Sequence, residues 1–404
     1  MSQKYPGGII SKTAPVTVGP VDGEGGSAPG VWTLTQALEL NKQNLWPKPV
    51  IPKELYAWGR NYFGQLGLND TYNRSSPVQV GSLTTWSQMT VGQNFAIVTK
   101  TDGTMWSWGS GGSGRLGLND TANRSSPVQV GALTSWSKVA GGSTFTIATK
   151  TDGTLWGWGY NGLGQLGFNN TANRSSPVQV GALTSWYQIA VGADFTLATK
   201  TDGTLWSWGR GSSGQLGLGD VVYRSSPVQV GALTTWYQIA AGNKHSVATK
   251  TDGTLWAWGY NAQGQLGLGD QVYRSSPVQV GALTTWSKIA GGNQSCFAIK
   301  TDGTLWSWGQ NGTGQLGLND TADRSSPVQV GALTTWYEVA GGNGFTLATK
   351  TNGTLWSWGQ GTYGRLGLGN TIYRSSPVQV GLLTTWSRLP KMPLGNSSLA
   401  LKTP

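Results

Sequence analysis

The sequence predicts an all-β fold in which seven four-stranded antiparallel blades close into a ring, and three observations lead to it. The phrase SSPVQVG begins at residues 75, 125, 175, 225, 275, 325 and 375, so one unit recurs every 50 residues without slippage. Each unit holds four short strand-like segments and no helical periodicity. The chain also begins and ends with partial units that complement each other. This combination is typical of a seven-bladed β-propeller.

The unit that starts at Ser125 shows the four expected strands in order. They are PVQV (127–130), WSKVAG (136–141), FTIATK (145–150) and TLWGWG (154–159). All are rich in β-branched and aromatic residues and are bounded by Gly, Asp and Thr. KTDGT separates the last two strands and indicates a tight hairpin, because Asp-Gly readily supplies positive φ angles.

Tryptophan indicates how the blades pack. Trp106 and Trp108 are two residues apart on one expected strand, so both rings leave the same face. A third tryptophan opens the second strand of each unit, and these three positions hold 20 of the 22 tryptophans. Between the paired rings the residue is always small: Ala57, Ser107, Gly157, Ser207, Ala257, Ser307 and Ser357. We expect the bulky face of each blade to pack against the shallow face of its neighbour. The alternative is that the tryptophans stack against sugars.

The two chain ends predict how the ring closes. Residues 54–59 match only the fourth strand of a unit, and residues 398–403 match only the third. We therefore expect Leu55–Gly59 to pair with Leu399–Lys402, which removes the open edges of a linear array. The segment 389–397 departs from the repeat and is two residues longer than the equivalent segment of the other units.

Composition excludes several classes of protein. Charged residues make up only 11% of the chain, with 62 Gly and 22 Trp, which fits neither a disordered polymer nor a charged helical protein. No apolar run approaches the ~18–20 residues of a membrane span. The N-terminus lacks the apolar core of a signal peptide, so we expect no export by that route. The single cysteine excludes internal disulfides.

The net charge of +11 comes largely from two repeated positions, which hold half of the 28 basic residues. One is the series Lys100, Lys150, Lys200, Lys250, Lys300, Lys350 and Lys402. The other is Arg74, Arg124, Arg174, Arg224, Arg274, Arg324 and Arg374. An aspartate lies four residues before five of the arginines, so a structural ion pair and anion recognition both remain open. No nucleic-acid motif is present, and we do not expect nucleic acid as the partner.

The sequence predicts no catalytic residues, no metal site and no cofactor. His245 and Cys296 are the only residues of their types and lie on different units, so we expect no Cys–His pair. A single His and a single Cys without carboxylate clusters cannot form a metal site. The aspartates of the TDGT turns (Asp102, Asp152, Asp202, Asp252 and Asp302) are expected to cap their own turns. A carboxylate pair across the channel is the alternative.

Comparison of the seven units locates the candidate binding residues. Residues vary most at positions 60–63, 71–73 and 93–95 and their equivalents, which the strand order places on one face. Tyr, Asn, Ser, Gly and Arg dominate there, a composition suited to adaptable binding, although neutral drift in exposed loops would look similar. The candidates are Arg60, Tyr62, Phe63, Tyr160, Asn161, Arg210, Tyr223, Lys244, His245, Tyr260, Asn261, Tyr273, Gln310, Tyr363 and Tyr373.

WGRNYFGQLG, WGYNGLGQLG and AAGNKHSVATKTDGTLWAWG resemble the repeats of the regulator of chromosome condensation family, in register over about residues 54–404. The resemblance implies a seven-bladed propeller. In that family the propeller serves in nucleotide exchange on a small GTPase, chromatin binding and inhibition of β-lactamases. Where the family often shows a histidine, only His245 fills the position here, and no inserted wedge is present, which argues against exchange.

Residues 1–52 precede the propeller at 53–404 and have a different composition. A Gly- and Pro-rich stretch is followed by VWTLTQALELNKQNLWP, which predicts a short amphipathic helix. Its apolar residues are Trp32, Leu34, Leu38, Leu45 and Trp46. This arm resembles N-terminal segments of virion structural proteins from marine and cyanobacterial phages, through GGIISK, GVWTL and LWP; a leader without function is the alternative.

These observations predict a non-enzymatic virion structural protein, made in the host cytoplasm and displayed on a phage tail or capsid. The arm would bind other virion proteins, and the propeller would bind a protein, or a receptor or glycan of the host surface. The alternative is a cytoplasmic regulatory propeller that binds another protein.

Overall fold

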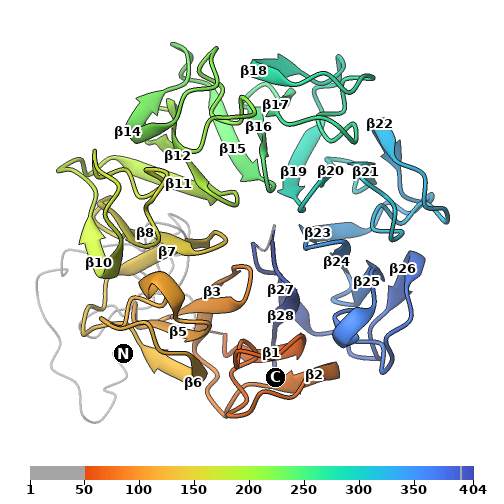
Figure 1. Ribbon diagram of the computed structural model, residues 1–404. Helices are drawn as coiled ribbons and strands as arrows, with labels where there is room; N and C mark the ends of the chain where they lie inside the picture. Colours follow the sequence, from red (N-terminus) through yellow and green to blue (C-terminus); the bar gives the residue numbers. More distant parts are fainter. Residues whose placement is uncertain (1–50, 392–393) are drawn as a thin grey trace, which may run out of the picture. The chain divides into compact units, whose positions relative to one another are not determined.

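The computed structural model describes residues 51–391 and 394–404, and the chain divides into two units, 1–52 and 53–404. The described residues form seven sheets of four antiparallel strands, arranged as blades around a central axis (Figure 1). The seven-bladed β-propeller is therefore confirmed. The predicted helix with Trp32, Leu34, Leu38, Leu45 and Trp46 lies outside the described residues.

The strands occupy four positions in each blade, from the axis outward. The innermost strands are β3 (Trp86–Val91), β7 (Trp136–Gly141), β11 (Trp186–Val191), β15 (Trp236–Ala241), β19 (Trp286–Gly291), β23 (Trp336–Gly341) and β27 (Trp386–Arg388). The second strands are β4 (Phe95–Lys100), β8 (Phe145–Lys150), β12 (Phe195–Lys200), β16 (His245–Lys250), β20 (Ser295–Lys300), β24 (Phe345–Lys350) and β28 (Ser397–Lys402).

The third strands carry the paired tryptophans, and the outermost strands carry the SSPVQ phrase. The third strands are β1 (Glu54–Gly59), β5 (Met105–Gly109), β9 (Leu155–Gly159), β13 (Leu205–Gly209), β17 (Leu255–Gly259), β21 (Leu305–Gly309) and β25 (Leu355–Gly359). The outermost are β2 (Arg74–Gln79), β6 (Arg124–Gln129), β10 (Arg174–Gln179), β14 (Arg224–Gln229), β18 (Arg274–Gln279), β22 (Arg324–Gln329) and β26 (Arg374–Gln379). Short 3-10 turns η1 (Gly112–Gly114) and η2 (Thr362–Gly364) follow β5 and β25.

The blade boundary differs from the boundary of the sequence unit. Each SSPVQ strand pairs with the tryptophan strand before it, as β6 does with β5, and so belongs to the preceding blade. A unit read from SSPVQ therefore spans two blades. The reason is that a periodic sequence defines the period of a blade but not its starting point.

The ring closes as predicted, with two strands from each chain end. The closing blade has the order β2-β1-β28-β27. Leu55 faces Leu401 and Ala57 faces Leu399 across the β1–β28 ladder, and the Lys402 Nζ lies 3.0 Å from Glu54 Oε2 at its end. This pairing satisfies the backbone groups that the two terminal strands would otherwise expose.

The core lies between neighbouring blades. Phe95, Ile97 and Met105 of one blade pack against Trp136 and Trp158 of the next. The rings of Trp136 and Trp158 meet edge to face with centroids 5.9 Å apart, a favourable arrangement for aromatic rings. Because Trp158 has no exposed surface, packing and not sugar stacking explains this repeated tryptophan.

The Gly-Gln-Leu-Gly phrase contacts a tryptophan of the next blade at the same interfaces. The Trp108 Nε1 donates a hydrogen bond of 3.0 Å to Gln65 O of the preceding unit. Gly67 has a φ of +72°, and a Cβ there would lie 2.8 Å from the Trp108 Nε1. Only glycine combines that backbone conformation with so close an approach of the ring.

The TDGT turns confirm the predicted role of their aspartates. Asp152 Oδ1 accepts hydrogen bonds from Thr154 N (2.9 Å) and Thr154 Oγ1 (2.6 Å), and the Trp156 Nε1 donates to Thr154 Oγ1. Lys150 completes the motif, with its Nζ 3.7 Å from the centroid of the Trp156 ring. Six of the repeated lysines thus lie over tryptophans and Lys402 lies over Tyr56, a cation–π arrangement that makes them part of the scaffold.

Candidate binding face

The connections between strands divide the propeller into two faces, as predicted. Ser110 N donates to Asn94 O (2.9 Å), so the loop after β3 and the loop after β5 lie together. Thr101 N donates to Thr85 O (2.8 Å), which joins the TDGT turn to the GALTTW segment at the other end. We call the end formed by 60–73 and 92–94 and their equivalents the loop face, and the end formed by 81–85 and 101–104 and their equivalents the turn face.

A ring of hydrogen bonds links adjacent blades on the loop face near the axis. The backbone NH groups of Ser143, Ala193 and Asn243 each donate to a carbonyl of the next blade, at 3.0–3.1 Å. The amide side chain of Asn243 donates to Asn293 (2.7 Å), and Asn293 donates in the same way to Asn343 (2.6 Å). The residues equivalent to Gln93 are therefore held by hydrogen bonds to the next blade and are less free to adapt to a partner than the outer loops.

One residue sets the backbone conformation of each 60–63 loop. Where the Gly-Gln-Leu-Gly phrase has its glutamine, the glutamine side chain accepts a hydrogen bond from the loop backbone, as Gln65 Oε1 does from Phe63 N (2.9 Å). Where it contains arginine, the side chain donates, as Arg365 Nε does to Thr362 O (3.1 Å). An acceptor and a donor require opposite orientations of the same peptide group, which explains the φ of +62° at Tyr363.

The strained Tyr363 belongs to a cluster of arginine and aromatic side chains. Its ring lies edge to face with Tyr62, with centroids 5.5 Å apart. The Arg60 guanidinium lies over both rings, 4.9 Å from the Tyr62 centroid and 5.5 Å from the Tyr363 centroid. Arg365 is buried beneath them, and burial lowers its pKa to about 10, so it is still charged at neutral pH. Tyr62 remains 52% exposed, which leaves it available to a partner.

A second cluster lies on two adjacent blades, one formed by β11–β14 and the other by β15–β18. Arg210 Nη1 is 3.6 Å from Asp194 Oδ2. Burial raises the pKa of the Asp194 carboxyl, while Arg210 and Lys244 oppose that shift. The Lys244 Nζ lies 5.7 Å from the Tyr260 ring, which packs against Tyr273 with centroids 4.7 Å apart.

Exposed apolar side chains flank this second cluster. Val221 and Val222 are 58% and 54% exposed, and Tyr223 is 45% exposed. Val272 and Tyr273 of the next unit are 58% and 46% exposed. We call these five residues the apolar patch. Three of them are consecutive in one loop and two are consecutive in the equivalent loop of the next blade, and grouped exposed apolar residues mark interaction sites more often than single ones do.

The two tyrosines of the apolar patch arise from a change at one loop position, and its valines occupy the two positions before it. Asn73 Oδ1 accepts from Asn61 N (2.8 Å), and Asn123, Asn173 and Asp323 make the same loop-closing bond. Tyr223, Tyr273 and Tyr373 occupy this position in the other units and lie exposed. The sequence candidates included these tyrosines but missed Val221, Val222 and Val272. β-Branched residues in a polar loop were the available signal.

Three sequence candidates do not lie on the surface. Asn161 and Asn261 have no exposed area; each Oδ1 accepts from Leu166 N or Leu266 N (2.9 Å), so they shape the loop from inside. His245 is also fully buried, because the first residue of each second strand points into the blade interface. These three residues are therefore removed from the candidate contact set. Phe63, Tyr160 and Gln310 are partly exposed on the loop face, as predicted.

The expectation that no Cys–His pair forms is wrong. His245 and Cys296 start the second strands of neighbouring blades, and His245 Nε2 lies 3.0 Å from Cys296 Sγ. Burial raises the pKa of the Cys296 thiol and lowers that of His245 to about 4. Both groups are therefore neutral at pH 7, whereas a cysteine nucleophile needs its thiolate.

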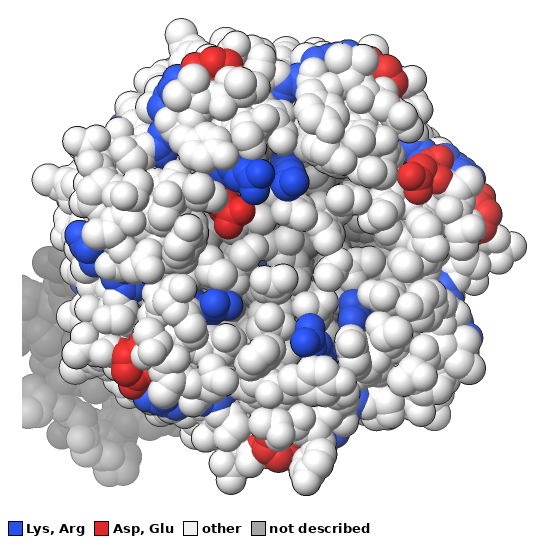
Figure 2. All heavy atoms as spheres, viewed as in Figure 1, with Lys and Arg blue, Asp and Glu red and all other residues white. Residues whose placement is uncertain are grey.

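The arginine series is mostly ion-paired. Arg74, Arg124, Arg224, Arg274 and Arg324 each lie 2.5–2.6 Å from the aspartate four residues before them. Arg174 and Arg374 follow Asn170 and Asn370 in place of aspartate. This favours the structural interpretation over anion recognition for the five paired arginines. Figure 2 shows a different gathering of basic side chains, around the central hollow of one face, while acidic side chains lie mainly toward the outer edge.

The described residues contain no group of three or more His, Cys, Asp or Glu side chains able to hold a metal ion. No helix in the described ranges has the length and hydropathy needed to cross a membrane.

Family models match most of the propeller. The model of the RCC1-like domain matches residues 52–288. Two models of the regulator of chromosome condensation (RCC1) repeat match residues 302–349 and 352–388, and residues 286–315 and 337–365. No curated protein matches the chain.

Solved structures share the fold at low sequence identity. Yeast RCC1 (Prp20) bound to Kap60 has a TM-score of 0.77 and 20% identity, over 88% of this chain and 89% of that one. Prp20p from Saccharomyces cerevisiae gives 0.77 and 22%, over 88% and 92%. Human WBSCR16 gives 0.76 and 20%, over 87% and 99%. At these identities the similarity concerns the fold alone.

Proposed function

Because the chain belongs to the RCC1-like domain family, whose model matches more than half of it, we propose that it is a non-enzymatic propeller that binds a protein partner through its loop face. The apolar patch is the observation that carries this proposal. Its five side chains are each about half exposed on two adjacent blades, beside the cations Arg210 and Lys244. An apolar centre with a polar rim is the usual composition of a protein interface.

The Arg60–Tyr62–Tyr363 cluster offers a second contact region on the same face. Tyrosine and arginine are enriched among the residues that contribute most to protein binding. Among the structural relatives, yeast RCC1 (Prp20) is bound to Kap60, and Prp20p has described binding properties toward Gsp1p and histones. The partners of these relatives are proteins, which agrees with the proposal.

Capture of a partner by matched variants tests the proposal. The full chain is immobilised as wild type, as V221S/V222S/Y223A, and as the turn-face control L233S/L283S, whose leucines are each 46% exposed. We expect one protein of the native host to be retained by wild type and the control, and its binding to weaken at least about tenfold in the patch variant. Equal retention by the patch variant, or loss in the control alone, would contradict the proposal.

The virion role is a separate proposal that rests on the sequence of residues 1–52. Its support is the resemblance of GGIISK, GVWTL and LWP to phage structural proteins. Mass spectrometry of purified phage particles tests it: the chain should be present in particles and should be lost from them when residues 1–52 are deleted. A regulatory propeller would instead be found only in the soluble fraction of the host.

A further inference from the structure

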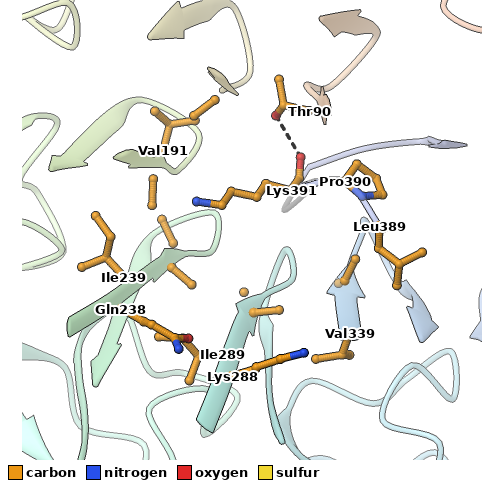
Figure 3. A pocket seen from close by; sticks show the side chains of 18 of the residues that line it. Thr90, Val191, Gln238, Ile239, Lys288, Ile289, Val339, Leu389, Pro390 and Lys391 are labelled. Atoms are coloured by element: carbon orange, nitrogen blue, oxygen red, sulfur yellow. Dashed lines mark hydrogen bonds between the residues drawn. The ribbon is translucent and has the colours of Figure 1, made fainter. Parts of the chain in front are cut away.

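A cavity of about 240 Å³ lies among the innermost strands. Most of the residues that line it are Ala, Gly, Val and Ile, and three charged residues also line it: Lys288, Glu338 and Lys391. Glu338 is the single carboxylate among these lining residues, so the carboxylate pair considered from the sequence does not form there. Figure 3 shows Lys391 extending across the cavity from the segment after β27.

Lys391 is a departure from the repeat. The six equivalent positions are occupied by small or apolar residues: Val91, Gly141, Val191, Ala241, Gly291 and Gly341. Pro390 has no NH to donate, and β27 ends already at Arg388. The Lys391 carbonyl accepts from Val91 N (3.0 Å) and Thr90 Oγ1 (2.9 Å), which fixes the backbone so that the side chain enters the cavity.

The Lys391 ammonium retains unused donors. Its Nζ donates to Ile189 O (3.1 Å), and an ammonium has three hydrogens to donate. No other acceptor contacts this Nζ among residues 51–391 and 394–404. The surrounding protein and the charge of Lys138 lower the Lys391 pKa to about 8, so most of this group is protonated at neutral pH. Lys391 is nevertheless exposed to solvent, so a dissolved anion can reach it.

The neighbouring charges do not neutralise Lys391. Glu338 accepts from Leu389 N (2.8 Å), and burial raises the pKa of its carboxyl, while Arg388 and Lys288 oppose that shift. The Lys288 Nζ donates to Tyr337 O (2.5 Å) and lies 3.6 Å from the Tyr337 ring. The lining therefore carries two cations and one anion, and the anion already has partners.

We propose that this cavity binds a small organic anion, with its carboxylate or phosphate at the Lys391 Nζ and a compact apolar body against Ile239, Ile289 and Val339. An apolar pocket with a few converging polar groups is the usual form of a small-molecule site. The cavity exceeds the ~150 Å³ that suffices for benzene, so it has room for an aromatic acid. This site is independent of the apolar patch and of the proposed partner.

Calorimetry on the full chain tests the site with four probes: benzoate, phenyl phosphate, inorganic phosphate and the neutral benzyl alcohol. We expect benzoate and phenyl phosphate to bind about tenfold more tightly than either inorganic phosphate or benzyl alcohol, because only these two probes use both the cation and the walls. Lys391→Met should weaken both aryl anions about tenfold and leave benzyl alcohol nearly unchanged. Ile239→Trp should weaken all three aromatic probes, because it fills the cavity.

Arg174→Met is the matched control, since it removes the same charge from the outermost strand β10. It should leave all affinities unchanged. The proposal is overturned if neither aryl anion binds below about 10 mM, or if Lys391→Met and Arg174→Met behave alike. If Lys391→Met does not fold, the comparison of the aryl anions with benzyl alcohol on wild type and on Ile239→Trp decides the question.

Discussion

The loop face and the turn face are built on the same strands, yet they differ in what their side chains do. On the turn face, Asp152, Thr154, Trp156 and Lys150 satisfy one another, and the same arrangement recurs from unit to unit. On the loop face, a single position alternates between the loop-closing Asn73 and the exposed tyrosines of other units. Exposed apolar residues occur on both faces. On the turn face they are leucines at one repeated position, with Leu382 beside Leu383 in the last unit, and on the loop face they include the apolar patch.

The difference shows that, within each unit, the residues that recur build the scaffold, whereas the candidate binding residues are among those that vary. Most side chains that bond inside the turn or pack at the blade interface, such as Asp152 and Trp158, recur from unit to unit because each has a defined partner. The exposed side chains that differ between units, such as Tyr223 and Val272, are candidates for contacts that a partner would supply. The comparison predicts large stability effects for the first group and binding effects for the second.

The largest effect is expected at the blade interface. Trp258→Ala removes a fully buried ring and its hydrogen bond to Gln215 O (3.0 Å), so it should cost about 3–5 kcal/mol in free energy of unfolding. Trp256→Ala is the matched control, because this ring is partly exposed and should cost clearly less. Urea denaturation measures both. Equal losses would mean that the interface does not dominate the stability of the ring.

A smaller effect on binding is expected in the apolar patch. Tyr223→Ala should weaken the captured partner by about 1–2 kcal/mol, and Tyr273→Ala by a similar amount. Neither should change the urea midpoint beyond the ±0.5 kcal/mol that is usual for surface substitutions. Titration of the purified partner against both variants checks this. A loss of stability in place of affinity would assign these tyrosines to the scaffold.

The buried His245 should give a pH dependence. Burial lowers its pKa to about 4, below the value of about 6.5 expected in the unfolded chain. The unfolded chain therefore binds more protons between these values, so stability should fall as the pH drops from about 6.5 to about 4. His245→Phe, which installs the residue found at 145 and 195, should reduce this slope; urea midpoints at pH 7.5 and pH 5 measure it. An unchanged slope would show that His245 does not cause it.

The smallest effect is expected in a TDGT turn. Hydrogen bonds from Thr154 lower the pKa of Asp152, so its stabilisation is present above about pH 4 and is lost as the pH falls through the lowered value. Asn352 makes the same two bonds to Thr354 in its own turn. Asp152→Asn should thus change stability by less than about 0.5 kcal/mol at pH 7 and weaken its dependence below pH 4. A larger loss at pH 7 would show that the negative charge matters beyond the turn.

Local and periodic signals predicted the scaffold. The tryptophan spacing, the TDGT turns and the two partial units led to the strands, the hairpins and the β1–β28 closure. The blade boundary could not be predicted, because a repeat has no intrinsic start. Comparison of equivalent residues in the seven units also indicates two features that were not predicted. Phe145 and Phe195 show that the position of His245 is buried. The small and apolar residues equivalent to Lys391 show that its position faces the cavity.

Contacts between units were the harder part. The His245–Cys296 pair was missed because residues 51 apart in the chain meet only when neighbouring blades align their second strands. The apolar patch was missed in part because its valines belong to a residue type usually associated with strands and cores. The predicted arm residues lie outside the described part of the chain, so their role stays a prediction.

Site-specific photo-cross-linking tests the central claim, that the loop face binds the partner and the turn face does not. A benzophenone amino acid replaces Tyr223 on the loop face or Leu283 on the turn face; their exposures are 45% and 46%. We expect the partner to be cross-linked from position 223 and not from position 283. Cross-linking from 283 alone, or equally from both positions, would contradict the assignment of the binding face.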